Sequence, residues 1–385
     1  MPTRPAEVPA EDSASLSTSS TEPTVELDPE SDRTPPSVQS FTFDPPEVTD
    51  GGATSLFVQA SDDLSGVKIA WGQIRSPSGA ASLQFGPQEQ GDSGVMPFRI
   101  PIPRDAETGV WYVATLSLTD RAGNSVVRSF SAASVPPGGT LRVVSSASDS
   151  TAPEVLQVWV ENAVVDGGEK NPIRVEARDD RSGVATITGY FQSAAKSAQI
   201  WFDCTSNADS GLWEGDVKLP KNADCGEWTL QLLKVVDKAG NIAFLQGGSP
   251  TLANVRFQVS GGSDCDSSAP TLEGFELSPT VVSNEIATEI VITATVLDVG
   301  TGAVSMSGWF EGPVSTSGQA PRNHFSCTPN RSDPEAPWTG KILVPQYAPK
   351  GIWKVGLIHL QDKARNFRQY TSADPVVAGS VFEVQ

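Results

Sequence analysis

The chain has 385 residues, enough for two or three domains, and 38% of them are hydrophobic, so it can bury sizeable cores. It holds 46 acidic against 27 basic residues, and the net charge of −19 excludes the basic footprint of a nucleic-acid-binding protein. No apolar run reaches the roughly 18 residues of a membrane-spanning helix, so we expect no membrane span in this chain.

The N-terminal segment, residues 1–33, is rich in Ser, Thr, Pro and Glu and has almost no large apolar side chain. Such a composition buries too little surface to fold, so we expect a disordered acidic tether. The segment also lacks the apolar stretch of a signal peptide. For a secreted protein, we therefore expect the signal sequence to lie outside this numbering.

The remainder of the chain repeats one unit. A motif that begins at Asp32 with an Asp-x-Thr-x-Pro pattern recurs at Asp149 and, with Ser268 in place of the Thr, at Asp266, a constant offset of 117 residues. A Gly-x-Trp motif also recurs, and each of its tryptophans precedes by nine residues the Asp of an Asp-x-Ala-Gly-Asn motif, which in the third copy has Arg365 in place of the Gly. We therefore predict three modules, at residues 34–147, 151–262 and 268–385.

Each unit is predicted to be β-structure. Short runs rich in Val, Ile and Thr are bounded by Gly, Asn and Asp, and about seven such runs in roughly 110 residues are typical of a β-sandwich. Pro97 and Pro101 predict that their run is an edge strand. In the run after Gly-x-Trp, Leu116 and Leu118 should face the core. Trp111 lies an odd number of residues from these leucines, so in a regular strand it would point to the opposite face. Either a bulge intervenes or the outer face is partly covered.

The motifs resemble those of tandem bacterial immunoglobulin-like repeats of secreted and cell-surface proteins. The resemblance covers residues 34–385 and rests on Asp-x-Thr-x-Pro, on Asp-Asp-x-Ser-Gly-Val (62–67 and 179–184) and on Gly-x-Trp followed by Asp-x-Ala-Gly-Asn. It implies an all-β chain of three tandem immunoglobulin-like sandwiches. It also implies a role as stalk, spacer or adhesive segment, in some members with calcium at the domain junctions.

The repeated aspartates are candidate metal ligands. In a sandwich of this topology, the loops after the second and sixth strands and the incoming linker lie at one end, so their carboxylates should converge. Clustered carboxylates suit Ca²⁺ and are unfavourable without a cation. The candidate ligands are Asp32, Asp62, Asp63 and Asp120 in the first module, and Asp149, Asp179, Asp180 and Asp237 in the second.

Two features limit the calcium hypothesis. Asp, Asn and Gly are also ordinary turn residues, so Asp-Asp-x-Ser-Gly and Asp-x-Ala-Gly-Asn could both be turns without a metal. Turn formation alone would explain the Gly and Asn of these motifs. In the third module, Val299 and Arg365 depart from the pattern, and Arg365 could neutralise Asp298 and Asp362 instead. We therefore do not carry the site over to the third module.

Other activities find less support in the sequence. The chain has two histidines, His324 and His359, and no metalloprotease, nucleophile-elbow or phosphate-loop motif, so we predict that it is not an enzyme. Exposed tryptophans could stack on sugars, and four that vary among the modules are candidates: Trp71, Trp159, Trp201 and Trp309. The three Gly-x-Trp residues are predicted to be structural.

Four cysteines predict two disulfides and an oxidising compartment, with four reduced thiols in a cytosolic protein as the alternative. Of the three possible pairings, Cys204–Cys225 with Cys265–Cys327 keeps each bridge within one module, and we predict that pairing.

Together these features predict a non-enzymatic, extracellular or cell-surface protein that forms a monomeric rod and binds a protein or glycan at a cell surface. The alternative is a spacer or carbohydrate-binding accessory region of a larger secreted hydrolase.

Overall fold

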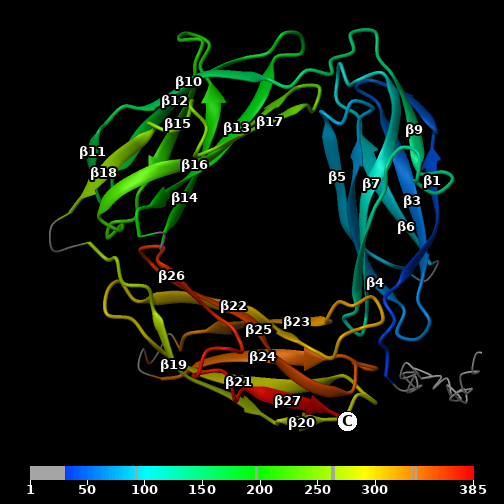
Figure 1. Ribbon diagram of the computed structural model, residues 1–385, viewed down its shortest axis with the longest axis vertical. Coiled ribbons are helices and arrows are strands. Elements are labelled where there is room, and N and C mark those ends of the chain that lie inside the picture. Colours follow the sequence, from blue (N-terminus) through cyan, green and yellow to red (C-terminus); the bar gives the residue numbers. More distant parts are fainter. Residues whose placement is uncertain (1–30, 92–93, 196–197, 262–264, 331–332, 334–335) are drawn as a thin grey trace, which may run out of the picture.

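The computed structural model describes residues 31–91, 94–195, 198–261, 265–330, 333 and 336–385. Nearly all of the predicted tether lies outside the described residues. The described part contains strands, turns and bends but no helix, and hence no helix that could cross a bilayer. The chain is all-β, with three tandem immunoglobulin-like sandwiches (Figure 1).

Module one contains nine strands in two sheets. Strands β1, β3 and β6 form one sheet, and β2, β9, β7, β4 and β5 form the other, with β8 paired to β7. The strands span β1 Ser37–Asp44, β2 Glu47–Thr49, β3 Ala53–Ser61, β4 Val67–Arg75, β5 Ser82–Glu89, β6 Val95–Pro101, β7 Gly109–Asp120, β8 Ser125–Ser129 and β9 Thr140–Val144.

Modules two and three repeat this order with one difference. Their fifth and sixth strands pair, so the two sheets join along one edge, whereas β5 and β6 of module one do not pair. The second module comprises β10 Glu154–Val160, β11 Val164–Asp166, β12 Lys170–Arg178, β13 Val184–Ser193, β14 Gln199–Ser206, β15 Trp213–Lys218, β16 Gly226–Asp237, β17 Ile242–Gln246 and β18 Arg256–Ser260.

The third module comprises β19 Thr271–Ser278, β20 Val281–Val282, β21 Thr288–Leu297, β22 Ala303–Glu311, β23 Arg322–Thr328, β24 Trp338–Val344, β25 Gly351–Asp362, β26 Phe367–Tyr370 and β27 Val381–Val384. The edge position of β6 confirms the expectation from Pro97 and Pro101, which have no N–H to donate to a further strand.

A β-bulge resolves the parity of the Gly-x-Trp strand. In module one, Gln73 lies opposite Thr115 but Ile74 lies opposite Val113, so β7 carries one extra residue. The same shift occurs in β16 and β25. The extra residue changes the face on which side chains point, and therefore both Trp111 and Leu116 are fully buried in one core.

The recurring tryptophans are structural, as predicted. Trp111, Trp228 and Trp353 are at most 1% exposed and lie among the largest fully buried side chains. Each indole N–H is satisfied by a backbone carbonyl four residues earlier, as in the 2.8 Å bond from Trp228 Nε1 to Asp224 O. A buried indole that keeps its hydrogen bond stabilises the core without a desolvation penalty.

The three modules do not form a rod. They surround a central space, and module three lies beside module one (Figure 1). The residues just before β1 contact module three directly: Asp32 N donates to Tyr347 O at 2.9 Å, and Arg33 Nη2 donates to Lys350 O at 2.8 Å. The prediction of a rod is therefore wrong, because repeated linkers fix the angle between neighbours and two such turns return the chain to its start.

Candidate cation sites at the module junctions

Three aspartates converge where a linker enters each module. One comes from the linker, one from the loop after the third strand of the module and one from the end of its seventh strand. Within each set, one carboxylate oxygen per residue lies within 4.8 Å of the others. The sets are Asp32, Asp62 and Asp120; Asp149, Asp179 and Asp237; and Asp266, Asp298 and Asp362.

The linker aspartate is held by backbone donors of the loop. In module one, Asp32 Oδ2 accepts from Ser65 N and Asp32 Oδ1 accepts from Thr34 N, both at 3.0 Å. Asp62 Oδ2 accepts from Gly66 N at 2.9 Å. The other modules repeat these bonds. This part of the arrangement is the turn chemistry that the motifs predict.

The asparagine of Asp-x-Ala-Gly-Asn is a member of the site that the sequence interpretation missed. Asn124 is 0% exposed. Its Nδ2 donates to Asp120 Oδ2 at 2.8 Å and to the backbone carbonyl of Asp32 at 3.0 Å. Asn241 and Asn366 make the same two bonds in their modules. The asparagine thus fastens the linker to the seventh strand, which a simple turn does not require.

Six buried oxygens in these sites have no hydrogen-bond partner among the described residues. In module one they are Asp62 Oδ1 and Asn124 Oδ1, and the equivalent pair recurs in the other two modules as Asp179 Oδ1, Asn241 Oδ1, Asp298 Oδ1 and Asn366 Oδ1. Buried acceptors are normally satisfied, so the same pair left unsatisfied three times requires an explanation.

A calcium ion fits these donors. Ca²⁺ takes carboxylate and amide oxygens at 2.3–2.6 Å, so two ligands on opposite sides of the ion lie up to about 5 Å apart. That span accommodates carboxylate oxygens within 4.8 Å of one another. No Lys or Arg in the described part of the chain forms an ion pair with any of the nine aspartates.

Burial and crowding disfavour ionisation without a cation. Burial, opposed by hydrogen bonds from Asn124 and reinforced by Asp32 and Asp62, raises the pKa of Asp120 to about 8. The same causes raise the pKa of Asp362 to about 6 and also raise that of Asp237. A bound divalent ion would offset this penalty, since an opposite charge favours the ionised carboxyl group.

The third module has the same arrangement despite its sequence departures. Val299 is 85% exposed and stands where the other modules have Asp63 and Asp180, which are also exposed and lie outside the clusters. Arg365 adopts a φ of 73° in place of a glycine and forms no ion pair with described residues. The expectation that Arg365 neutralises Asp298 and Asp362 finds no ion pair to support it.

The linker before each module docks onto another module in the same way each time. Asp149 N donates to Asp105 O of module one, and Asp266 N donates to Asn222 O of module two. At the third junction, Asp32 N donates to Tyr347 O of module three. The third junction is not covalent, because no linker joins the end of module three to the start of module one, yet it uses equivalent contacts.

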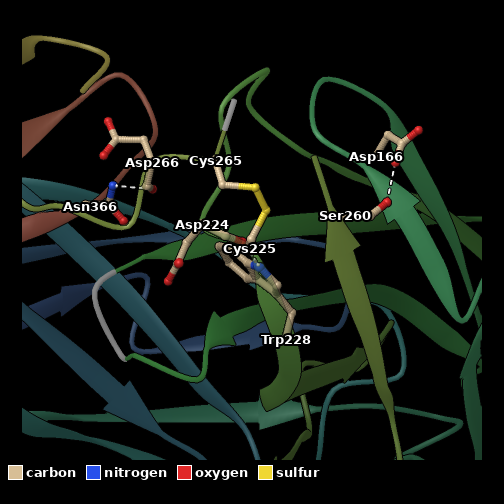
Figure 2. Close-up of a disulfide and its surroundings, with 8 residues drawn as sticks. All are labelled: Asp166, Asp224, Cys225, Trp228, Ser260, Cys265, Asp266 and Asn366. Carbon is tan, nitrogen blue, oxygen red and sulfur yellow. Dashed lines mark hydrogen bonds between the residues drawn. A yellow bond between two sulfur atoms is a disulfide. The ribbon is translucent and has the colours of Figure 1, made fainter. Parts of the chain in front are cut away.

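The disulfide lies at one of these junctions. Cys225, in the loop before β16, is bonded to Cys265 in the next linker, 40 residues along the chain (Figure 2). Ser148 and Ser31 occupy the position of Cys265 in the other linkers. Their hydroxyls accept from Thr108 N at 2.8 Å and Lys350 N at 2.9 Å.

The predicted pairing of cysteines is therefore wrong. Cys204 and Cys327 are free, buried in the cores of modules two and three, and burial raises the pKa of each thiol to about 12. A bridge within one module was expected, but the linker that carries Cys265 packs against module two as well as module three. One disulfide still supports an oxidising compartment.

The tryptophans that vary among the modules differ in exposure. Trp201 is 57% exposed and packs against Tyr190, with 4.7 Å between ring centroids, and Trp71 is 49% exposed. Trp159 is half-buried. Trp309 is also half-buried and lies beside His324 and under Arg322.

Comparisons with known proteins find only distant likeness to solved structures. No protein family and no curated protein matches the chain. Similar solved structures include Cwp6 from Clostridium difficile, with 14% identity, 36% of this chain and 22% of that chain covered, and a TM-score of 0.22. The N-terminal eight Ig domains of Down Syndrome Cell Adhesion Molecule have 12% identity, 88% and 36% coverage, and a TM-score of 0.22.

The D00-D0 domain of Intimin has 12% identity, 55% and 95% coverage, and a TM-score of 0.18. The chain spans well under two thirds of the length of the first two of these structures. Likeness at this level carries no argument about fold or function.

Proposed function

We propose that this chain is a non-enzymatic structural or adhesive protein, extracellular or at a cell surface, whose three junctions are stiffened by calcium. The observation that carries the proposal is the repeated pair of unsatisfied buried oxygens beside three carboxylates at every junction. Each site takes its ligands from the linker and from two loops of the module, so a bound ion would fix the linker against the module. The Cys225–Cys265 disulfide supports the extracellular location.

A calcium titration tests the proposal. We expect the full chain to bind three Ca²⁺ ions, with dissociation constants in the range of about 10⁻⁴–10⁻³ M that is common in extracellular modules. Asp62→Ala, Asp179→Ala and Asp298→Ala should each remove one ion from the stoichiometry measured by calorimetry, because each deletes an unsatisfied buried oxygen.

The exposed neighbours of these residues provide matched controls. Asp63→Ala and Asp180→Ala remove a carboxylate of the same loop that lies outside the cluster, so the stoichiometry should stay at three. If wild-type protein binds no calcium, the aspartates serve only as turn residues. If the controls lose an ion as the cluster variants do, the clusters are not the sites that hold the ions.

A second function, glycan binding by an accessory region of a secreted hydrolase, is favoured by the Trp201–Tyr190 pair. An exposed, braced aromatic face is a platform on which a sugar ring can stack. We expect Trp201→Ala to weaken glycan binding at least about tenfold in an array experiment, the loss of roughly one stacking contact of ~1.4 kcal/mol. Phe244, which is 60% exposed, supplies the control Phe244→Ala. Equal binding by both variants would rule out this platform.

A further inference from the structure

A basic cavity lies where module three meets module one. It has a volume of about 410 Å³ and takes Lys68 and Arg121 from module one and Arg322, His324 and Lys341 from module three. Glu289 is the one acidic residue in its lining. Four permanent cations around one carboxylate are unexpected in a chain with a net charge of −19.

Two of these cations lack an acidic partner. Lys341 Nζ pairs with Glu289 at 2.7 Å, and Arg322 pairs with Glu311 at 3.3 Å. In the described part of the chain, Lys68 and Arg121 form no ion pair. Both side chains are exposed. The local potential is positive enough to affect the imidazole of His324: burial lowers its pKa, and Arg322 and Lys68 lower it further.

Two of the four cations, Lys68 and Arg322, are specific to this junction, whereas Arg121 has the cationic equivalents Lys238 and Lys363. The strand registers align Lys68 with residues 185 and 304, and Arg322 with residues 82 and 199. None of these equivalents is charged: they are Ala185, Val304, Ser82 and Gln199. The covalent junctions therefore assemble without the charges of Lys68 and Arg322.

Closing the ring brings these cations together, which costs free energy unless an anion lies between them. Arginine presents a planar fork of donors that matches carboxylate, sulfate and phosphate groups, and lysine adds a compact charge. Leu343, which is 61% exposed, and Pro345 give the cavity an apolar side that could contact the carbon skeleton of a larger ligand.

We propose that this cavity binds an oxyanion group, held by Lys68 and Arg121 on one side and by Arg322 and Lys341 on the other. The bound group bridges modules one and three. It acts at the one junction that has no covalent connection, and the lining of the cavity does not include the clustered aspartates of the cation sites. The ligand class is a free inorganic oxyanion or the anionic group of an acidic polysaccharide.

Histidine NMR gives a local test in the full chain, because His324 and His359 are its two histidines. Sulfate is titrated against chloride at constant ionic strength. We expect the pKa of His324 to rise by about half a unit or more on sulfate binding, since an anion stabilises the imidazolium. The pKa of His359, which lies outside the cavity lining, should not change.

Variants identify the groups responsible. Arg121→Ser should weaken sulfate binding at least about tenfold, the loss of a charge-assisted contact of ~1.4 kcal/mol or more. Lys238→Ser is the control, since Lys238 occupies the equivalent position in module two, and its response should match the wild type. The NMR readout also reports directly whether each variant is folded.

A sulfated or uronic-acid polysaccharide distinguishes the two sources. Binding at least about tenfold tighter than inorganic sulfate assigns the site to a polymer, and weaker binding assigns it to a free ion; either result supports an oxyanion site. The proposal is overturned if chloride reproduces the sulfate effect, if His359 responds as His324 does, or if Arg121→Ser binds sulfate like the wild type.

Discussion

Oxidation of a Ser31→Cys/Lys350→Cys variant is expected to link the N-terminal linker to module three within a single chain. The two residues occupy the positions of Cys265 and Cys225, whose Cα atoms are 5.5 Å apart. The wild-type residues already meet, because Lys350 N donates to Ser31 Oγ at 2.9 Å across 319 residues of sequence. By the loop-closure account, a bridge over that span stabilises the fold by up to about 5 kcal/mol.

Non-reducing peptide mapping measures this result. The digest should contain the 31–350 linkage in monomeric protein, together with the natural Cys225–Cys265 linkage as an internal standard. A Ser31→Cys/Thr108→Cys variant is the matched control, because Thr108 belongs to a different junction and contacts Ser148. The linkage should be absent there.

Two outcomes would contradict a closed ring. A 31–350 linkage confined to dimers would show that module three engages the linker of a second chain, as a head-to-tail interface does. Equal cross-linking in the control would show that the N-terminal linker is not held at module three.

The sequence was sufficient to predict what is local to one module. A constant offset of 117 residues aligned the copies, and the positions of Asp32, Asp62 and Asp120 at one end followed from sandwich topology. The sequence left two alternatives for the strand before Leu116, a bulge or a partly covered outer face. The spacing of apolar residues alone does not reveal that a strand carries an extra residue.

What the sequence did not predict depends on contacts between modules. An internal offset identifies equivalent residues but not the angle at a linker, so neither the ring nor the Cys225–Cys265 bridge followed from it. The role of Asn124 had a readable signal. Module three replaces the glycine of the motif by Arg365 but keeps Asn366, so the turn tolerates another residue whereas the amide is retained.

Calcium is expected to stabilise the protein more at high pH than at low pH. Ca²⁺ binds the folded state and not the unfolded state. A calcium concentration about 100 times the dissociation constant therefore raises the free energy of unfolding by about 2.7 kcal/mol per site. For a module of this size that corresponds to a rise in melting temperature on the order of 10 °C. Bound calcium requires ionised carboxylates, and protons compete with it wherever the pKa of a ligand is raised.

The sign of the pH dependence follows from Asp120. Without a cation, its pKa of about 8 in the folded state exceeds the value of 3.8 expected for an unfolded chain. Between these values the folded state holds a proton on Asp120 that the unfolded state has lost. The contribution of this protonation to the free energy of unfolding is therefore complete at low pH and disappears as pH rises through 8. Chelated protein should therefore lose stability over this window, and calcium should restore it.

The modules should respond at different pH values. Asp362 has a pKa of about 6, so calcium competes with its proton at a lower pH than with that of Asp120. Melting in millimolar calcium and in chelator, from pH 5 to pH 9, should show curves that diverge with pH, module three first and module one last. Asp298→Ala should remove the earlier divergence alone, and Asp62→Ala the later one. Curves that coincide at pH 9, where no proton remains on these carboxylates to compete, would mean that they do not bind calcium. Curves that stay apart by the same amount across the range would mean that calcium binds without displacing these protons.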